Sequence, residues 1–413
     1  MARLILPFIL IALLFNVCSR REAGKEKADG NSNEPARPAS ANAPPRDNVQ
    51  EGTEVTFYPT YGYMKGSEWA IPLRGWVHEH RRLPGKVIGE IAKRIAHCEE
   101  AEIENFRSRA EDFLEDDESR QEIIIEFDAD PEKQQYKFPK KSDPNGLIET
   151  ELTLSGEKAQ GLLEKQNSAN GWLTYRAVSG GHRGTGRIHL VQPQGLSVVT
   201  DIDDTIKVTE VPAEKEIVVR NTFCRDFVSA KGMADRYKAL GDGVSFHYVS
   251  GGPWQLYGPL YDFLMSGQEG FPEGTFHFSY FPKNVLSRET RTILKDLIAG
   301  ALDKTYNHKV AQITTLMERF PGRKFILVGD SGELDPEVYH FIREKFPQQV
   351  QEIWIRDVVG DEAVNRERLA SMNIVAKAEP TVCAAPKHFE KLSLMIKRLR
   401  NLSYNKNRNP PCG

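Results

Sequence analysis

Three carboxylates crowd into one short segment of the chain, Asp201-Ile202-Asp203-Asp204-Thr205. Like charges at this spacing repel one another, so a positive partner should compensate them, and a divalent cation is the natural candidate. In an extended segment Asp201 and Asp203 point to the same side, because side chains alternate along a strand. One carboxylate of such a pair can attack as a nucleophile while the other transfers a proton to the leaving oxygen. The alternative is an acidic turn that caps the next helix.

Three further polar clusters also follow apolar segments. Ser250-Gly251-Gly252-Pro253 offers a hydroxyl and free backbone N–H groups, which can bind an anion, although Gly-Gly-Pro is also an ordinary strand-to-helix turn. Lys309 begins an apolar-striped helix and could bind phosphate or simply be solvated. Gly329-Asp330-Ser331-Gly332-Glu333-Leu334-Asp335 adds acidic groups suited to a metal. Together, the four clusters predict phosphoryl transfer, which needs mainly positioning and charge stabilisation.

Strands that alternate with helices must position these clusters. After residue 195 the apolar runs predict strands at 196–200, 245–249, 275–281, 324–328 and 351–355, with helices near 225–240, from 253, near 288–300, at 308–320 and from 336. This alternation predicts βαβ units and a parallel sheet. Ligands bind at the carboxyl ends of the strands in such sheets, where all four clusters are expected.

Residues 53–195 are expected to form a smaller β-rich, sandwich-like domain. Short β-branched and aromatic runs separated by turn residues predict strands at 53–58, 69–77, 121–127, 147–154, 171–177 and 185–192. Apolar residues at helical spacing across 86–115 predict one inserted helix.

The motif set resembles the phosphatidate phosphatase catalytic domain of the yeast actin-patch type, within the haloacid-dehalogenase-type phosphatases. The resemblance rests on Thr200-Asp201-Ile202-Asp203-Asp204-Thr205-Ile206-Lys207, on residues 250–257 and on residues 328–337. Segments 58–62, 74–77 and 186–187 also resemble that family's β-rich N-terminal part, so the resemblance covers 53–360. It implies an α/β fold in which a Rossmann-like parallel-sheet domain at 196–360 follows the β-rich domain.

The resemblance also implies catalytic roles. Asp201 would be the nucleophile that forms an aspartyl-phosphate. Asp203 would protonate the leaving alcohol and then activate the hydrolytic water. Thr205 would help to orient the phosphoryl group, and Lys309 would bind it.

Metal and phosphate ligands follow from the same resemblance. Mg²⁺ would be held by the carboxylates of Asp201 and Asp330 and by the backbone carbonyl of Asp203, with Asp335 supporting the waters of the metal. Ser250 and the backbone at Gly251 would contact the phosphate together with Lys309.

Three functions compete at this point. The first is a Mg²⁺-dependent phosphatase for phosphatidate or a related phosphomonoester lipid, and the second is a phosphatase for a soluble phosphomonoester in the cell envelope. The third is a non-catalytic lipid-binding module, which would predict the loss of Asp201 or Asp203, yet both are present.

The N-terminus is expected to be an export signal. Residues 1–18 combine an early Arg3 with a 14-residue apolar run that ends at Cys18, which resembles a bacterial lipoprotein signal in which this cysteine is lipidated. Val17 stands where such signals have a small residue, and an uncleaved anchor or ordinary cleavage are the alternatives. Residues 19–52 are polar and Pro-rich and are expected to be a disordered tether. These features predict a membrane-anchored lipoprotein exported to the bacterial cell envelope.

Residues 361–413 are expected to be a helical, basic tail. Within 384–413 seven basic residues oppose only Glu390, and Phe389, Leu392, Met395, Ile396 and Leu399 form an apolar face at helical spacing. Such a helix can lie on an anionic membrane, or it can pack its apolar face on the protein body.

Composition and cysteine usage exclude several classes of protein. The 413 residues suit two to three domains, and 39% apolar and 27% charged residues exclude disorder of the whole chain. No apolar run is long enough for a multi-span membrane protein. A net charge of −3 disfavours nucleic acid as a partner. The five cysteines form no C-x-x-C pair; Cys98 and Cys224 are expected to be buried and unpaired, and Cys383 and Cys412 could pair in an oxidising envelope.

Overall fold

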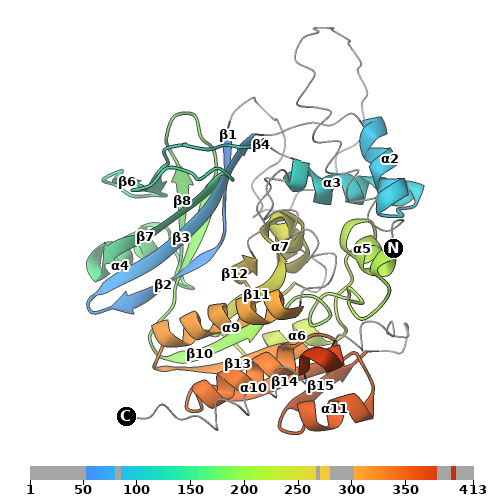
Figure 1. The fold of residues 1–413 in the computed structure, drawn as a ribbon. Coiled ribbons are helices and arrows are strands. Elements are labelled where there is room, and N and C mark those ends of the chain that lie inside the picture. The colour runs from blue at the N-terminus through green and yellow to red at the C-terminus, as the bar shows by residue number, and fades with distance from the viewer. Residues whose placement is uncertain are drawn as a thin grey trace, which may run out of the picture.

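The computed structural model describes residues 53–79, 85–114, 116–266, 270–279, 302–378 and 392–396. In these residues the strands form two separate sheets, one mixed and one parallel, as Figure 1 shows. The expected signal and lipidation site (Cys18), the tether, the helix near 288–300 and the Cys383–Cys412 pair lie outside the described residues. In the part of the chain that is described, every helix is too short or too polar to span a bilayer.

The mixed sheet occupies residues 53–190 and has nine strands. They are β1 (Thr53–Phe57), β2 (Thr60–Lys65), β3 (Glu68–Glu79), β4 (Asp116–Asp117), β5 (Ile124–Phe127), β6 (Gln135–Lys137), β7 (Leu147–Ser155), β8 (Trp172–Ala177) and β9 (Thr185–Leu190), with α4 (Gly156–Lys165) after β7. The strand order is β1-β3-β2-β9-β8-β5-β6, and β4 and β7 also pair with β3. Apolar side chains from strands that are not neighbours, such as Ile148 of β7 and Leu173 of β8, share one buried cluster. The region expected to be β-rich therefore forms a separate mixed sheet, whereas a sandwich-like domain stays a prediction.

Two helices, rather than one, interrupt this sheet between β3 and β4. They are α2 (Gly85–Ile95) and α3 (Ile103–Leu114), and η1 (Glu100–Glu102) joins them. The helix breaks near His97, whose φ of 56° lies in the left-handed region that a right-handed helix cannot include.

Cys98, which follows this break, forms a disulfide with Cys224. The expectation that these two cysteines are unpaired is wrong. The fold brings their Cα atoms to 5.3 Å, a normal disulfide separation, across 126 residues of sequence.

The second sheet confirms the predicted parallel arrangement. Its strands are β10 (Gly195–Thr200), β11 (Ser245–Pro253), β12 (Gly274–Ser279), β13 (Arg323–Asp330), β14 (Val350–Asp357) and β15 (Asn373–Lys377), in the order β12-β11-β10-β13-β14-β15. Every neighbouring pair is parallel. Because β15 pairs with β14, the sheet extends into the segment expected to be a helical tail.

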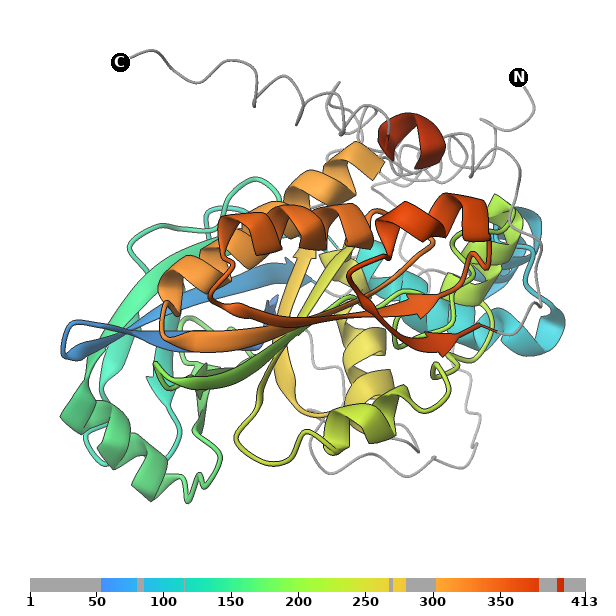
Figure 2. The same cartoon turned by 90° about the horizontal axis from the view of Figure 1, so that it is seen from below.

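Helices cover both faces of the parallel sheet, as Figure 2 shows. They are α6 (Met233–Lys238), α7 (Tyr257–Ser266), which follows η2 (Trp254–Leu256), α9 (Leu302–Arg319), α10 (Asp335–Lys345) and α11 (Glu362–Arg368), whereas α5 (Lys215–Phe223) packs beside α2 and α3. Adjacent residues of β10 point to opposite faces: Val198 joins the apolar cluster of α6 and α7, whereas Val199 joins that of α9 and α10. The apolar stripe of α9 is core, as expected, although α9 begins at Leu302 and not at 308.

Aromatic contacts join the two sheets. Trp76 of β3 meets the Trp254 ring edge-on with a centroid distance of 4.8 Å, and Tyr58 meets the same ring at 5.7 Å. The Phe276 amide of β12 donates to the Pro59 carbonyl at 3.0 Å. Tyr58 and Trp76 therefore belong to the core of the parallel-sheet domain as well as to the β-rich part.

Candidate active site

The predicted site residues gather at the carboxyl edge of three neighbouring parallel strands. Asp201 directly follows β10, Ser250 lies in the last part of β11, and Asp330 ends β13. The pairing of β10 with β11 and β13 brings these positions together, and the Asp201 amide donates to the Val328 carbonyl of β13 at 2.9 Å. The strand order alone thus assembles residues that are far apart in sequence.

Three buried carboxylates form the centre of the site. One oxygen of each of Asp201, Asp330 and Asp335 lies within 4.8 Å of the others. Asp330 Oδ1 accepts from the amides of Gly332 (2.6 Å) and Glu333 (3.3 Å), but the buried Oδ2 has no donor among the described residues. A buried acceptor without a donor is costly, whereas a cation would satisfy it. An all-oxygen donor set of this kind suits a hard divalent cation.

Among the residues that the structure describes, one buried lysine opposes these carboxylates. Lys309 Nζ lies 2.8 Å from Asp201 Oδ1 and 3.5 Å from Glu333 Oε2, and it also contacts Asp335. Burial alone would lower the pKa of Lys309, but the surrounding carboxylates outweigh burial and raise that pKa well above its ordinary value. With Asp330 included, four carboxylates face one ammonium group, and this excess of negative charge again fits a cation.

The two carboxylates expected to share the chemistry have different environments. Asp201 is buried, which raises its pKa well above the ordinary range although Lys309 opposes this effect. Asp203 lies outside the three-carboxylate group, and its side chain is 28% exposed. Burial also acts to raise the pKa of Asp203, but Lys207 at 2.8 Å and the hydroxyl of Thr209 at 2.5 Å outweigh it and lower that pKa. Their surroundings thus shift the pKa values of the two carboxylates in opposite directions before any ligand binds.

The third carboxylate of the run organises a turn. Asp204 has a φ of 56°, and its carboxylate accepts from the amides of Thr209 (2.9 Å), Glu210 (2.7 Å) and Val211 (2.6 Å). Thr205, which was expected to orient a phosphoryl group, donates its hydroxyl to Asp201 Oδ2 at 3.1 Å. These bonds fix the loop that presents Asp201 and Asp203.

The Ser250 loop, which is the irregular end of β11 at residues 250–253, lies against α9. Ser250 is buried, and its hydroxyl accepts from the Gly252 amide at 3.0 Å. A Cβ atom on Gly251 would lie 2.7 Å from the side chain of Thr305 of α9, so this position requires glycine. Thr305 precedes Lys309 by about one helical turn, and the close approach therefore brings the Ser250 loop beside Lys309.

Three residues near the site were not predicted from the sequence to be functional. Lys207 and Thr209 contact Asp203, and Glu333 contacts Lys309. Their only signal was proximity to an acidic motif, which does not indicate where a side chain points.

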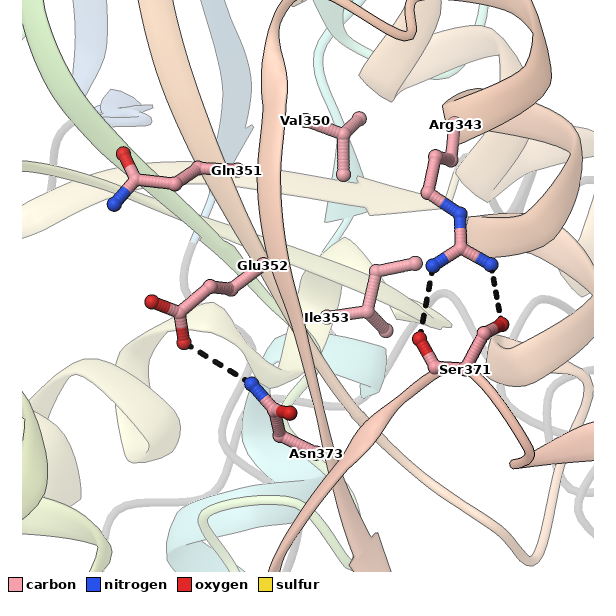
Figure 3. Close-up of a pocket in the computed structure, with 7 residues that line it drawn as sticks. All are labelled: Arg343, Val350, Gln351, Glu352, Ile353, Ser371 and Asn373. Atoms are coloured by element: carbon pink, nitrogen blue, oxygen red, sulfur yellow. Dashed lines mark hydrogen bonds between the residues drawn. The ribbon is translucent and has the colours of Figure 1, made fainter.

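A hollow in the surface lies apart from this site. Figure 3 shows that it is lined at the amino-terminal ends of β14 and β15, the opposite edge of the sheet. Four of its polar side chains pair with one another: Arg343 donates to the Ser371 hydroxyl at 2.6 Å, and Asn373 donates to Glu352 at 3.2 Å. This hollow offers no carboxylate cluster for the predicted chemistry.

The parallel-sheet domain is similar in sequence to known proteins. Residues 196–357 match the catalytic domain of phosphatidate phosphatase APP1. Phosphatidate phosphatase APP1 of Saccharomyces cerevisiae is 36% identical over 170 residues, which cover 40% of this chain and 26% of that protein. An uncharacterized protein of Schizosaccharomyces pombe is 27% identical over 177 residues, which cover 42% of this chain and 27% of that protein. The chain thus spans about a quarter of the length of these relatives.

The matched segment contains the predicted catalytic, phosphate-binding and metal-binding residues. These matches therefore support the expectation of a phosphatase domain at the carboxyl edge of the parallel sheet. A solved carbohydrate esterase structure covers 84% of this chain and 97% of its own at 10% identity, but a TM-score of 0.21 is too low to indicate a shared fold.

Proposed function

We propose that this protein is a Mg²⁺-dependent phosphatidate phosphatase that works through an aspartyl-phosphate intermediate. One observation carries the proposal: a buried aspartate, Asp201, lies beside Lys309 and two further carboxylates inside a segment that matches the APP1 catalytic domain. Such a constellation suits phosphoryl transfer, because that reaction depends on a positioned nucleophile and on compensation of the phosphate charge.

The donor set fits Mg²⁺. The carboxylates of Asp201, Asp330 and Asp335 would hold the ion together with the backbone carbonyl of Asp203, and Asp330 Oδ2, which has no donor among the described residues, is the best-prepared ligand. When bound, Mg²⁺ would neutralise the carboxylates and withdraw charge from the phosphoryl oxygens.

Different residues of the chain carry out different parts of the reaction. A carboxylate oxygen of Asp201 attacks phosphorus, and the bond from phosphorus to the lipid oxygen breaks as Asp203 gives that oxygen a proton. Asp203 then takes a proton from the water that attacks the aspartyl-phosphate, which releases phosphate and restores Asp201. Lys309, Ser250 and the backbone amides of the Ser250 loop bind phosphoryl oxygens throughout.

Asp203 must acquire its proton within the substrate complex. In the free protein Lys207 and Thr209 lower the pKa of Asp203, outweighing burial, which acts in the opposite direction. A bound phosphate places negative charge near this carboxylate and therefore raises its pKa. Proton uptake thus accompanies substrate binding.

The cellular setting is also a proposal. Residues 1–18 would be a lipoprotein signal with Cys18 as the anchor, residues 19–52 would be a tether, and a phospholipid membrane would be the substrate surface. The Cys98–Cys224 disulfide supports export, because disulfides persist mainly in oxidising compartments.

The described part of the C-terminal segment, 392–396, favours packing on the protein body. Leu392 and Ile396 are buried against Leu334 and Tyr306, whereas Leu394 is 70% exposed. The apolar face expected from the sequence therefore covers the loop of Asp335 in these residues.

Trapping of a phosphorylated protein tests the proposal. The full chain is mixed with Mg²⁺ and phosphatidate that carries ³²P in its phosphate, and the reaction is stopped with acid. We expect covalent label in the wild type and none in Asp201→Asn, with Asp242→Asn, at an exposed position, as the control. Label on another residue, or phosphate release without any labelled protein, would contradict the proposed mechanism.

A further inference from the structure

We infer that Lys207 is a positioning residue for Asp203 and that the helical insertion of residues 85–114 holds Lys207 in place through Phe227. The inference rests on the proposed function, because it concerns how the proton-transferring side chain is held. It also gives a role to an insertion that lies outside the matched domain.

Lys207 forms a closed triangle with Asp203 and Thr209. Its Nζ lies 2.8 Å from Asp203 Oδ1 and also donates to the Thr209 hydroxyl, which in turn donates to the same Asp203 oxygen at 2.5 Å. The lysine side chain is only 2% exposed, so an ammonium group is kept here at a desolvation cost. Two donors on one oxygen fix the orientation of the Asp203 carboxylate and leave its other oxygen for the substrate.

Phe227 connects this triangle to the insertion. The Nζ of Lys207 lies 4.9 Å from the centre of the Phe227 ring, and the Cζ of Arg109 of α3 lies 3.7 Å from it. Each cation contacts the ring within the range of a cation–π interaction. The aromatic ring therefore joins a residue of the insertion to the partner of Asp203.

Side chains of the insertion form hydrogen bonds with the backbone near Phe227. Arg109 donates to the carbonyls of Thr222 (3.2 Å) and Arg225 (2.5 Å), and Asn105 donates to the Cys224 carbonyl at 2.9 Å. The Cys98–Cys224 disulfide fixes the same segment covalently. Figure 1 shows α3 beside α5, which ends next to Cys224.

Backbone hydrogen bonds connect the same segment to residues 201–209, the loop that presents Asp201 and Asp203. The Val208 amide donates to the Val228 carbonyl at 2.8 Å, and the Ala230 amide donates to the Ile206 carbonyl at 2.8 Å. Lys207 lies between these two hydrogen bonds. Movement of the 222–230 segment would therefore move Lys207 and, through it, the Asp203 carboxylate.

A residue that only positions the proton donor should affect turnover more than substrate binding. For Lys207→Met in the full chain, we expect the kcat for phosphatidate in Mg²⁺-containing mixed micelles to fall at least about 10-fold, since general acid–base catalysis contributes about 10² to 10⁴. KM and the rise in Tm on adding Mg²⁺ should change less than about twofold. The Cys98→Ser/Cys224→Ser variant should show the same split with a smaller loss. Lys231→Met, at a nearby exposed lysine, is the matched control.

The outcomes separate the inference from the proposed function. A kcat within twofold of the wild type for Lys207→Met, or an equal loss of the Mg²⁺-induced Tm shift, would overturn the positioning role. If Lys207→Met does not fold, Thr209→Val removes the other donor to Asp203 and should reproduce the kcat loss. Absence of phosphate release by the wild type would overturn the proposed function and the inference together.

Discussion

At the scale of single residues, the site is a balance of opposed charges. Asp201, Asp330 and Asp335 are buried close together, and Lys309 compensates only part of their charge. Burial and the neighbouring carboxylates raise the pKa of Asp330 well above its ordinary value. Repulsion of this kind destabilises the metal-free protein, and a bound cation would remove it.

The substitution Asp330→Asn should show that this carboxylate destabilises the metal-free protein and is needed to bind the metal. We expect the metal-free variant to unfold about 2–4 °C above the wild type, the shift that roughly 1 kcal/mol gives in a domain of about 150–250 residues, because one buried negative charge is gone. The rise in Tm on adding Mg²⁺ should disappear, because the ligand with the partnerless oxygen is lost. Thermal unfolding with Mg²⁺ and with EDTA measures both effects.

Asp242→Asn provides the control for a change of charge alone, because this carboxylate is exposed. It should leave both Tm values unchanged. If Asp330→Asn kept the full Mg²⁺-induced shift, Asp330 would not be a metal ligand.

The sequence predicted the central residues of the site but not their neighbours. Asp201 and Asp330 follow apolar strands of a parallel sheet, so their meeting followed from position alone. Lys207 gave no such signal, because its role depends on Phe227 and Arg109, which only the tertiary structure brings close. Two roles implied different surroundings for Asp201 and Asp203, but the residues that create the difference, Lys207 and Thr209 at Asp203, were not predicted.

At the scale of elements, the Ser250 loop and α9 pack closely against each other. Gly251 approaches Thr305 so closely that a methyl group would overlap its side chain, whereas a Cβ on Gly252 would meet only the Ser250 hydroxyl, at 3.2 Å. The two adjacent glycines thus differ in the space available to them. This difference makes them a natural pair for a test.

Gly251→Ala should push the Ser250 loop away from α9. We expect a loss of about 1–3 kcal/mol in stability, typical of overpacking, and a clear rise in KM for the phosphate substrate. Gly252→Ala should change both quantities less, since only one hydroxyl must rotate. Denaturant unfolding and steady-state kinetics on the two variants, side by side, check this order; the reverse order would contradict the packing described.

The helix boundaries predicted from the sequence were wrong where contacts with the site or with distant residues decide them. The apolar stripe of α9 begins only at Val310, while its first turns carry Thr305 and Lys309 toward the site, so periodicity missed its start at Leu302. The helix expected near 225–240 forms only at Met233–Lys238, because residues 224–230 are held by a disulfide and by pairing with residues 206–208. Tertiary contacts override local helical spacing in both places.

At the scale of the whole molecule, the insertion and the two sheets are joined around one phosphatase domain. Trp76 and Tyr58 of the β-rich part pack in the core of the parallel-sheet domain. Helix α3 hydrogen-bonds to the segment 222–230, which pairs with the loop of Asp201 and Asp203. Sequence composition indicated separate β-rich and α/β regions. It could not predict their junction, because aromatic residues pack equally well within a domain or between domains.

Phosphate release by the full chain tests the central claim most directly. Wild type and Asp201→Asn are compared with Mg²⁺ on phosphatidate in mixed micelles and, in parallel, on glycerol phosphate. The proposed function predicts release from the lipid by the wild type, a loss of at least about 10³-fold in Asp201→Asn, and little release from glycerol phosphate. Release from glycerol phosphate alone, or from neither substrate by a folded protein, would contradict it.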